Sequence, residues 1–223
     1  MKTYFSQDVF DSLKDLRLNN NREWYYENKE RINSSRKELE DFVNLLIPEV
    51  RKFDSNIGFI EPKKTIYKQS RDIRFSPDKT PFKTHYAAVL FYGGLKQMGM
   101  PCYYFHIEEG HSMFSGGVYC PEKETLKKIR DEIYYNVDEF KSIINEKSFL
   151  KFYNGIDSEE KLKMAPKGYS KDWPDIDILK NKHFCASHFL SPQKMMDKDF
   201  LNYTIEAFEA LSDLNKFLYR AMN

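Results

Sequence analysis

The amino-acid sequence predicts an α+β fold in which a central, mainly antiparallel sheet packs against helices from the N- and C-terminal parts of the chain. Two observations support this class. Segments with helical spacing of apolar residues lie at both ends of the chain, and segments with strand-like alternation are grouped between them. We therefore expect a single domain over residues 1–223, helical over 1–55, strand-rich over 62–120 and helical again over 121–223.

The N-terminal part is predicted to form two helices. Residues 7–18 carry apolar side chains at helical spacing, and a second apolar stripe follows the polar turn at 19–21. Asn20 or Asn21 is a suitable N-cap for this second, longer helix, and Pro48 is expected to kink it near its end.

Two side chains one turn apart on the long helix have different expected roles. Trp24 is expected to be buried. Asn28 is a poor helix former in mid-helix, so we expect it to bond the turn at residues 76–79.

Three strands are predicted in the middle of the chain. Residues 86–92, 102–108 and 113–119 are rich in β-formers, and we expect them to pair consecutively and antiparallel. Alternation along the second strand places Phe105 and Ile107 on its buried face.

Glycines mark two special points in this region. Residues 93–100 have the composition of a hairpin loop. The pair Gly116–Gly117 lies inside the third strand, which indicates a bulge or a place where another group approaches the backbone closely.

The remainder of the chain is predicted to be helical. Pro121 suits the first turn of a helix and Asn136 can cap the next one. Residues 163–177 contain Pro and Gly in a pattern typical of a long surface loop, and a final helix is expected over 200–219.

Composition excludes several classes of protein. Hydrophobic residues make up 41% of the 223 residues, which argues against global disorder, and the formal net charge of +1 argues against indiscriminate nucleic-acid binding. No apolar run approaches the ~20 residues that span a bilayer, and the N-terminus does not resemble a signal peptide, so we expect a cytoplasmic protein without a membrane partner. The three cysteines include no CxxC pair, which disfavours a disulfide framework or a structural zinc site.

Charge is nevertheless concentrated in one segment. Between Pro62 and His85 there are seven Lys or Arg residues and two Asp residues, so this segment carries 7 − 2 = +5. A Pro-stiffened turn at 76–79 would hold the side chains in place. We expect a site here for a small anionic ligand that carries phosphate or carboxylate, because Arg donates bidentately to such groups and Lys adds charge. The predicted ligand-binding residues are Lys68, Arg71, Asp72, Arg74, Asp78, Lys79 and Lys83.

An internal ion-pair network is the alternative interpretation of the same segment, with Asp72 paired to Arg71 or Arg74. A third alternative is a basic patch without a specific ligand. Within the cluster, we expect Arg74 to face a ligand and Arg71, which adjoins Asp72, to be partly structural. Removal of a structural Arg would leave its carboxylate partner unpaired.

The predicted catalytic residues are His85, His106 and Glu108. Tyr104, His106 and Glu108 share one face of the predicted strand 102–108, next to the strand preceded by His85. A His with an acidic neighbour can transfer protons near neutral pH, whereas ordinary cross-strand pairing is the alternative. These residues and His111 are also the candidates for a metal site, but the set is sparse, so we expect no stoichiometric transition metal. Common cofactor motifs are absent from the sequence, and no cofactor is expected.

A rival functional hypothesis is a non-enzymatic module that binds single-stranded nucleic acid or a protein partner. The basic segment is interleaved with aromatic residues on which bases could stack, namely Tyr67, Phe75, Phe82 and Tyr86. The near-zero net charge and the lack of a known nucleic-acid motif count against it. The sequence leaves open whether the protein is an enzyme.

Three segments together resemble the family known as domain of unknown function 2461, a bacterial family with some fungal members. They are NNNREWYYENKERI, YKQSRDIRFSPDKTPFKTHYAAVLF and YYFHIEEGHSMFSGGVYCPEKETLKKIR, and the similarity continues through KLKMAPKGY and residues 179–184. The resemblance covers nearly the whole chain and implies a stand-alone single-domain bacterial protein. It implies no particular activity or cofactor.

The family signature RDxRFxxDKxP is matched by the basic segment, and two nearby positions depart from the expected pattern. Lys68 stands where Arg is expected, and Phe82 stands where Tyr is expected, so no phenol is present at that position. The positions that match are Arg71, Asp72, Arg74, Phe75, Asp78 and Lys79.

Overall fold

A computed structural model describes residues 3–93 and 98–223, and its centre is a four-stranded antiparallel sheet. The strands are β1 (Tyr86–Phe91), β2 (Cys102–Ile107), β3 (Met113–Val118) and β4 (Phe184–Phe189), in that spatial order. The α+β class and the three predicted strands are confirmed. Part of the expected hairpin loop, residues 94–97, lies outside the described residues.

Helices lie before β1, between β3 and β4, and after β4 along the chain. The N-terminal helices are α1 (Gln7–Leu18), α2 (Arg22–Glu27), α3 (Lys29–Phe53), the short 3-10 helix η1 (Ser55–Ile57) and α4 (Pro62–Thr65). The later ones are α5 (Lys123–Tyr135), α6 (Val137–Ile144), α7 (Lys147–Leu150), α8 (Ile176–Leu179), α9 (Pro192–Met195) and α10 (Phe200–Arg220). Throughout the described ranges, no helix combines the length and apolarity that crossing a membrane requires.

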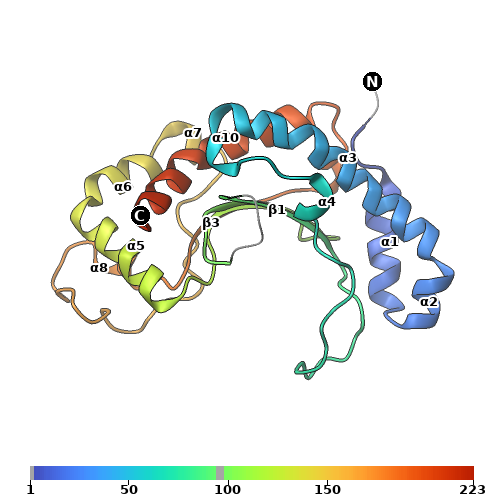
Figure 1. Ribbon diagram of the computed structural model, residues 1–223, viewed down its shortest axis with the longest axis horizontal. Helices are drawn as coiled ribbons and strands as arrows, with labels where there is room; N and C mark the ends of the chain where they lie inside the picture. The colour runs from blue at the N-terminus through green and yellow to red at the C-terminus, as the bar shows by residue number, and fades with distance from the viewer. Residues whose placement is uncertain (1–2, 94–97) are drawn as a thin grey trace.

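The two faces of the sheet have different environments. One face carries Phe105, Ile107 and Phe114, which are fully buried against side chains of α3 and α10 and form the main core. In Figure 1 these two helices lie along the outer, convex side of the curved sheet. The concave side is flanked by an arm formed by residues 66–85 and, at the other end, by α5 and the loop that precedes α8. The main core therefore lies on the convex side of the sheet.

The N-terminal helices differ from the prediction at two positions. Trp24 was expected to be buried, but it is only partly buried, because it lies on the short helix α2, which has no buried residue. Asn21 caps α2 by accepting a hydrogen bond from the backbone N–H of Trp24, as expected. Asn28 ends α2 and begins α3, and its side chain donates to the carbonyl of Trp24, so the expected bond to the turn at 76–79 is not formed. The residue that holds the arm is Asn20. Its amide donates to the carbonyl of Phe82 (2.9 Å) and accepts from the Phe82 N–H (3.1 Å).

Gly116 and Gly117 allow two close approaches to the backbone of β3, as the sequence indicated. A Cβ at Gly116 would lie 2.9 Å from the carbonyl oxygen of Cys102 and 2.7 Å from Leu211 Cδ1 of α10. Gly117 has a φ of +111°, and a Cβ there would lie 2.0 Å from the carbonyl oxygen of Phe184. These glycines therefore let α10 pack on one side of β3 and β4 pair along its edge.

Strand β4 is the element that the sequence analysis missed. Its segment FCASHF lies in the part of the chain expected to be helical, and only its first three residues are buried. With one end exposed, it lacks the regular alternation by which strands are recognised. The strand completes the sheet by pairing with β3 from Val118↔Phe184 to Met113↔Phe189.

The arm at residues 66–85 is a two-stranded extension joined to the edge of β1. It is held together by the backbone bonds Lys83 N–H to Gln69 carbonyl (2.8 Å) and Arg71 N–H to Pro81 carbonyl (2.9 Å). Phe82 at its base is buried and stacks on Tyr25, with ring centroids 3.8 Å apart. The tip, residues 72–80, extends away from the sheet (Figure 1).

Candidate functional site

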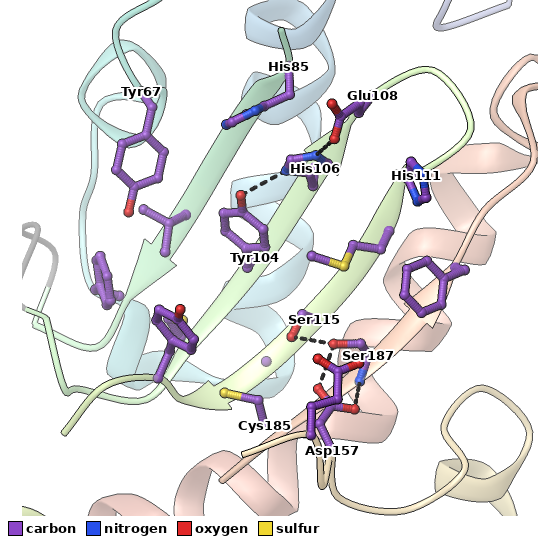
Figure 2. Close-up of a pocket in the computed structure, with 18 of the residues that line it drawn as sticks. Tyr67, His85, Tyr104, His106, Glu108, His111, Ser115, Asp157, Cys185 and Ser187 are labelled. Carbon is purple, nitrogen blue, oxygen red and sulfur yellow. Dashed lines mark hydrogen bonds and ion pairs between the residues drawn. The ribbon is translucent and has the colours of Figure 1, made fainter. Parts of the chain in front are cut away.

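A cavity of about 630 Å³ occupies the concave face of the sheet. Figure 2 shows its side chains, which come from all four strands, from the base of the arm and from the loop around Asp157. Polar groups lie toward two ends of the cavity, around Glu108 and around Asp157 (Figure 2), and the apolar lining residues include Val89, Phe91 and Met113. The size and the mixed lining are typical of a site for a small organic molecule.

The first polar end is a hydrogen-bonded chain on β2. Because side chains alternate along a strand, Tyr104, His106 and Glu108 point to the same face. The hydroxyl of Tyr104 lies 2.9 Å from Nδ1 of His106, and Nε2 of His106 lies 3.1 Å from Oε2 of Glu108. Both interactions are visible as dashed lines in Figure 2. The imidazole is therefore fixed at both ring nitrogens.

The register of β1 with β2 brings His85 next to His106 and Glu108. Ala87 of β1 pairs with His106 and Tyr86 pairs with Ile107, so one further step along this register sets His85 opposite Glu108. The ring centroids of His85 and His106 are 4.4 Å apart. One ligand-type atom from each of His85, His106 and Glu108 lies within 4.8 Å of the other two. The three residues predicted to be catalytic are thus brought together.

Burial keeps both imidazoles neutral. Removal from water, the largest cause, and the neighbouring His106 together lower the pKa of His85 to about 4. The pKa of His106 is also lowered by burial, although its hydrogen bond to Glu108 acts in the opposite direction. Neutral imidazoles beside a carboxylate can accept a proton or bind a metal ion.

The second polar end lies across the sheet, where the loop before α8 meets β4. The hydroxyl of Ser187 donates to Oδ2 of Asp157 (2.7 Å), and the Ser187 N–H donates to Oδ1 (3.2 Å). Ser115 Oγ of β3 lies 3.1 Å from Ser187 Oγ. Burial raises the pKa of Asp157 despite these hydrogen bonds.

The two cysteines in the cavity are poor nucleophiles. Cys102 and Cys185 line the floor, and both thiols are buried. Burial raises the pKa of Cys102 to about 12 and raises that of Cys185 as well. Since the thiolate is the reactive form, these side chains contribute shape rather than covalent chemistry.

The arm contributes one cation to the cavity. Nζ of Lys83 lies over the ring of Tyr67, 4.7 Å from its centroid, and both residues line the cavity wall. Among the lining residues that the structure describes, Lys83 is accompanied by three carboxylates, those of Glu108, Asp157 and Glu159.

The other predicted ligand-binding residues lie outside the cavity lining, on the arm. Arg71 pairs with Asp78 and also donates to the Thr80 carbonyl at 3.2 Å, whereas Arg74 pairs with Asp72 at 2.7 Å. The side chain of Arg71 is 26% exposed and that of Arg74 is 75% exposed. Lys79 donates to the carbonyl of Ile73 at 3.0 Å. Lys68 is exposed.

Sequence reasoning missed the far half of the cavity. Asp157, Glu159 and Ser187 come from a loop and a strand that were not assigned, and only the pairing of β3 with β4 brings them to the pocket. Tyr67 was assigned to base stacking but forms part of the wall. The segment FCASHF held the one sequence pattern that could have indicated this half of the cavity. Its alternate residues Cys185 and Ser187 both line the cavity, as expected for one face of a strand.

Comparison with known proteins gives one result. Residues 8–217 match the family described as "Conserved hypothetical protein (DUF2461)". No significant match was found among curated proteins or among solved structures.

Proposed function

The chain belongs to the DUF2461 family, and because that description names no reaction, we propose a function from the cavity itself: it binds a small organic molecule with an apolar body and an anionic group, phosphate or carboxylate. The observation that carries this proposal is the cavity of about 630 Å³, whose lining combines apolar side chains with polar groups and one lysine. The anionic group would bind to Lys83 at the end of the cavity that contains His85. The apolar body would contact Val89, Phe91 and Met113.

This proposal relocates the anion site from the tip of the arm to its base. At the tip, the guanidinium groups of Arg71 and Arg74 already have carboxylate partners. Neither pair lines a concave site, and the exposed pair of Arg74 with Asp72 contributes little to stability. Lys83 is the predicted ligand-binding residue that lines the cavity.

The nucleic-acid alternative receives little support from the arm. Two of the four aromatic residues on which it relied, Phe82 and Tyr86, are buried, and Tyr67 is part of the cavity wall. Phe75 at the tip is 93% exposed, which provides a single stacking surface. Proteins that bind single-stranded nucleic acid stack successive bases on several aromatic side chains.

Calorimetric titration with phenyl phosphate and benzoate tests the proposal. Wild-type protein should bind one of them saturably, and Lys83→Met should weaken binding by roughly tenfold or more, the loss of one hydrogen bond to a charged group. Arg74→Ala is the matched control, because it removes a cation of the same segment outside the cavity. A loss in Arg74→Ala with no change in Lys83→Met would return the site to the tip of the arm.

A further inference from the structure

We propose that His85, His106 and Glu108 bind a divalent transition-metal ion, which supplies the positive charge that meets the anionic group of the ligand. The inference deepens the proposed function and rests on it only for the ligand. Metal binding itself stands on the geometry of the three side chains.

The geometry of the cluster is close to that of a coordination site. Two atoms that each lie about 2.1 Å from one ion are roughly 3.0–3.5 Å apart when the angle at the metal is between octahedral and tetrahedral. His106 Nε2 and Glu108 Oε2 are 3.1 Å apart. The third atom, from His85, lies within 4.8 Å of both. A small side-chain rotation of His85, which precedes β1 and is only half-buried, would complete the site.

Small neighbours leave space at this point of the sheet. Ala87 lies between His85 and the rest of β1 on the same face, and it is paired with His106 across the strands. Its side chain is a single methyl group, the smallest that a chiral residue has, and the ring centroids of His85 and His106 are 4.4 Å apart. His85, His106 and Glu108 all line the cavity, so an ion held by them would face water or an anionic group bound there.

Further contacts orient the ligands, as is usual in metal sites. Tyr104 Oη lies 2.9 Å from His106 Nδ1, so the Nδ1–H can donate a hydrogen bond to it while Nε2 binds the metal. Thr84 donates to Oε1 of Glu108 (3.2 Å), which leaves Oε2 directed to the site. Ser112, which is buried, bonds both the N–H and the carbonyl of Glu108 and fixes the turn after β2.

Charge also favours a cation here. The described lining residues include three carboxylates and one lysine, so a bound cation would offset the excess negative charge and would add to the attraction of Lys83 for an anionic ligand. Two imidazoles and one carboxylate are donors that suit zinc or iron, and three protein ligands leave positions open for a ligand or water. This proposal replaces the prediction from sequence that no stoichiometric metal is bound.

The test uses the full chain, treated with a chelator, dialysed and titrated with CoCl2 while the visible absorption of the cobalt is recorded. Wild-type protein should bind about one equivalent. His85→Gln and Glu108→Gln should each lose at least about tenfold in affinity, the scale seen even for residues beyond the ligands. His111→Gln is the matched control, because His111 lines the same cavity outside the three-residue cluster. Thermal melts verify that each variant is folded.

Three results would overturn the inference: no saturable cobalt spectrum, unchanged affinity in Glu108→Gln, or equal losses in His85→Gln and His111→Gln. Phenyl phosphate titrations with and without cobalt separate this inference from the proposed function. Tighter phenyl phosphate binding in the presence of cobalt supports both. Binding that depends on Lys83 but is unaffected by cobalt overturns the metal inference and leaves the proposed function in place. Cobalt binding without any binding of phenyl phosphate or benzoate supports the metal site and contradicts the proposed function.

Discussion

Replacement of Gly117 by alanine should destabilise the protein through two separable effects. The residue has a φ of +111°, where an L-residue costs about 1–2 kcal/mol. The new Cβ would also lie 2.0 Å from the carbonyl oxygen of Phe184 and 2.9 Å from Cα of Cys185. Because both are backbone atoms, no rotamer change relieves the contact, and overpacking of this kind adds about 1–3 kcal/mol. The expected total loss is about 2–5 kcal/mol of unfolding free energy.

Gly155 provides a matched control for the backbone effect alone. Its φ is +105°, yet nothing lies within 4 Å of a Cβ built on it. Urea unfolding should therefore show that Gly155→Ala loses about 1–2 kcal/mol and that Gly117→Ala loses clearly more. Hydrogen exchange should show faster exchange along β4, which the clash would displace. Equal losses in the two variants would refute the account of how β4, and with it the Ser187 end of the cavity, is positioned.

Three further predictions concern the core, the arm and pH. Asp54 is buried and accepts hydrogen bonds from the hydroxyls of Tyr103 (2.6 Å) and Tyr92, so Asp54→Ala should cost about 2–6 kcal/mol in urea unfolding, from two unsatisfied hydroxyls at about 1–3 kcal/mol each. A loss below about 1 kcal/mol would contradict this role. On the arm, Arg71→Ala should lower the melting temperature and Arg74→Ala should leave it unchanged, because the Arg71 side chain is 26% exposed and that of Arg74 is 75% exposed; equal losses would refute the distinction. In the presence of a chelator, the melting temperature should fall as pH decreases from about 6.5 to about 4, because the pKa of folded His85 is lowered to about 4 and the unfolded chain takes up the proton first. His85→Gln should flatten this slope, and an unchanged slope would contradict the burial of the neutral ring.

The parts of the fold with regular patterns were predictable from the sequence. The bounds predicted for the first helix, residues 7–18, agree with α1, and the three central strands differ from the predicted ranges by one residue each at their ends. Gly116–Gly117 correctly indicated a close backbone approach because only glycine tolerates one in a strand. β4 was not predictable in the same way, because its last three residues are partly or fully exposed and its apolar pattern is incomplete.

Only the part of the candidate site that lies on β2, and His85 next to it, was predictable from the sequence. Alternation on 102–108 gave Tyr104, His106 and Glu108, and proximity of the neighbouring strand added His85. Position along the chain could not show that the basic residues 71–79 extend away from the sheet, since their direction is set by the arm's pairing with Pro81, Phe82 and Lys83. The side chains at the far end of the cavity depend on long-range pairing of β3 with β4, which local pattern does not encode.

Crystal diffraction at the cobalt absorption edge, on protein soaked with CoCl2 and phenyl phosphate, tests the central claim most directly. We expect one strong anomalous peak about 2.1 Å from His106 Nε2, between His85 and Glu108, with the phosphate bound next to it in the concave cavity. A phosphate bound at the tip of the arm beside Arg71 and Arg74, with no anomalous peak in the cavity, would contradict it.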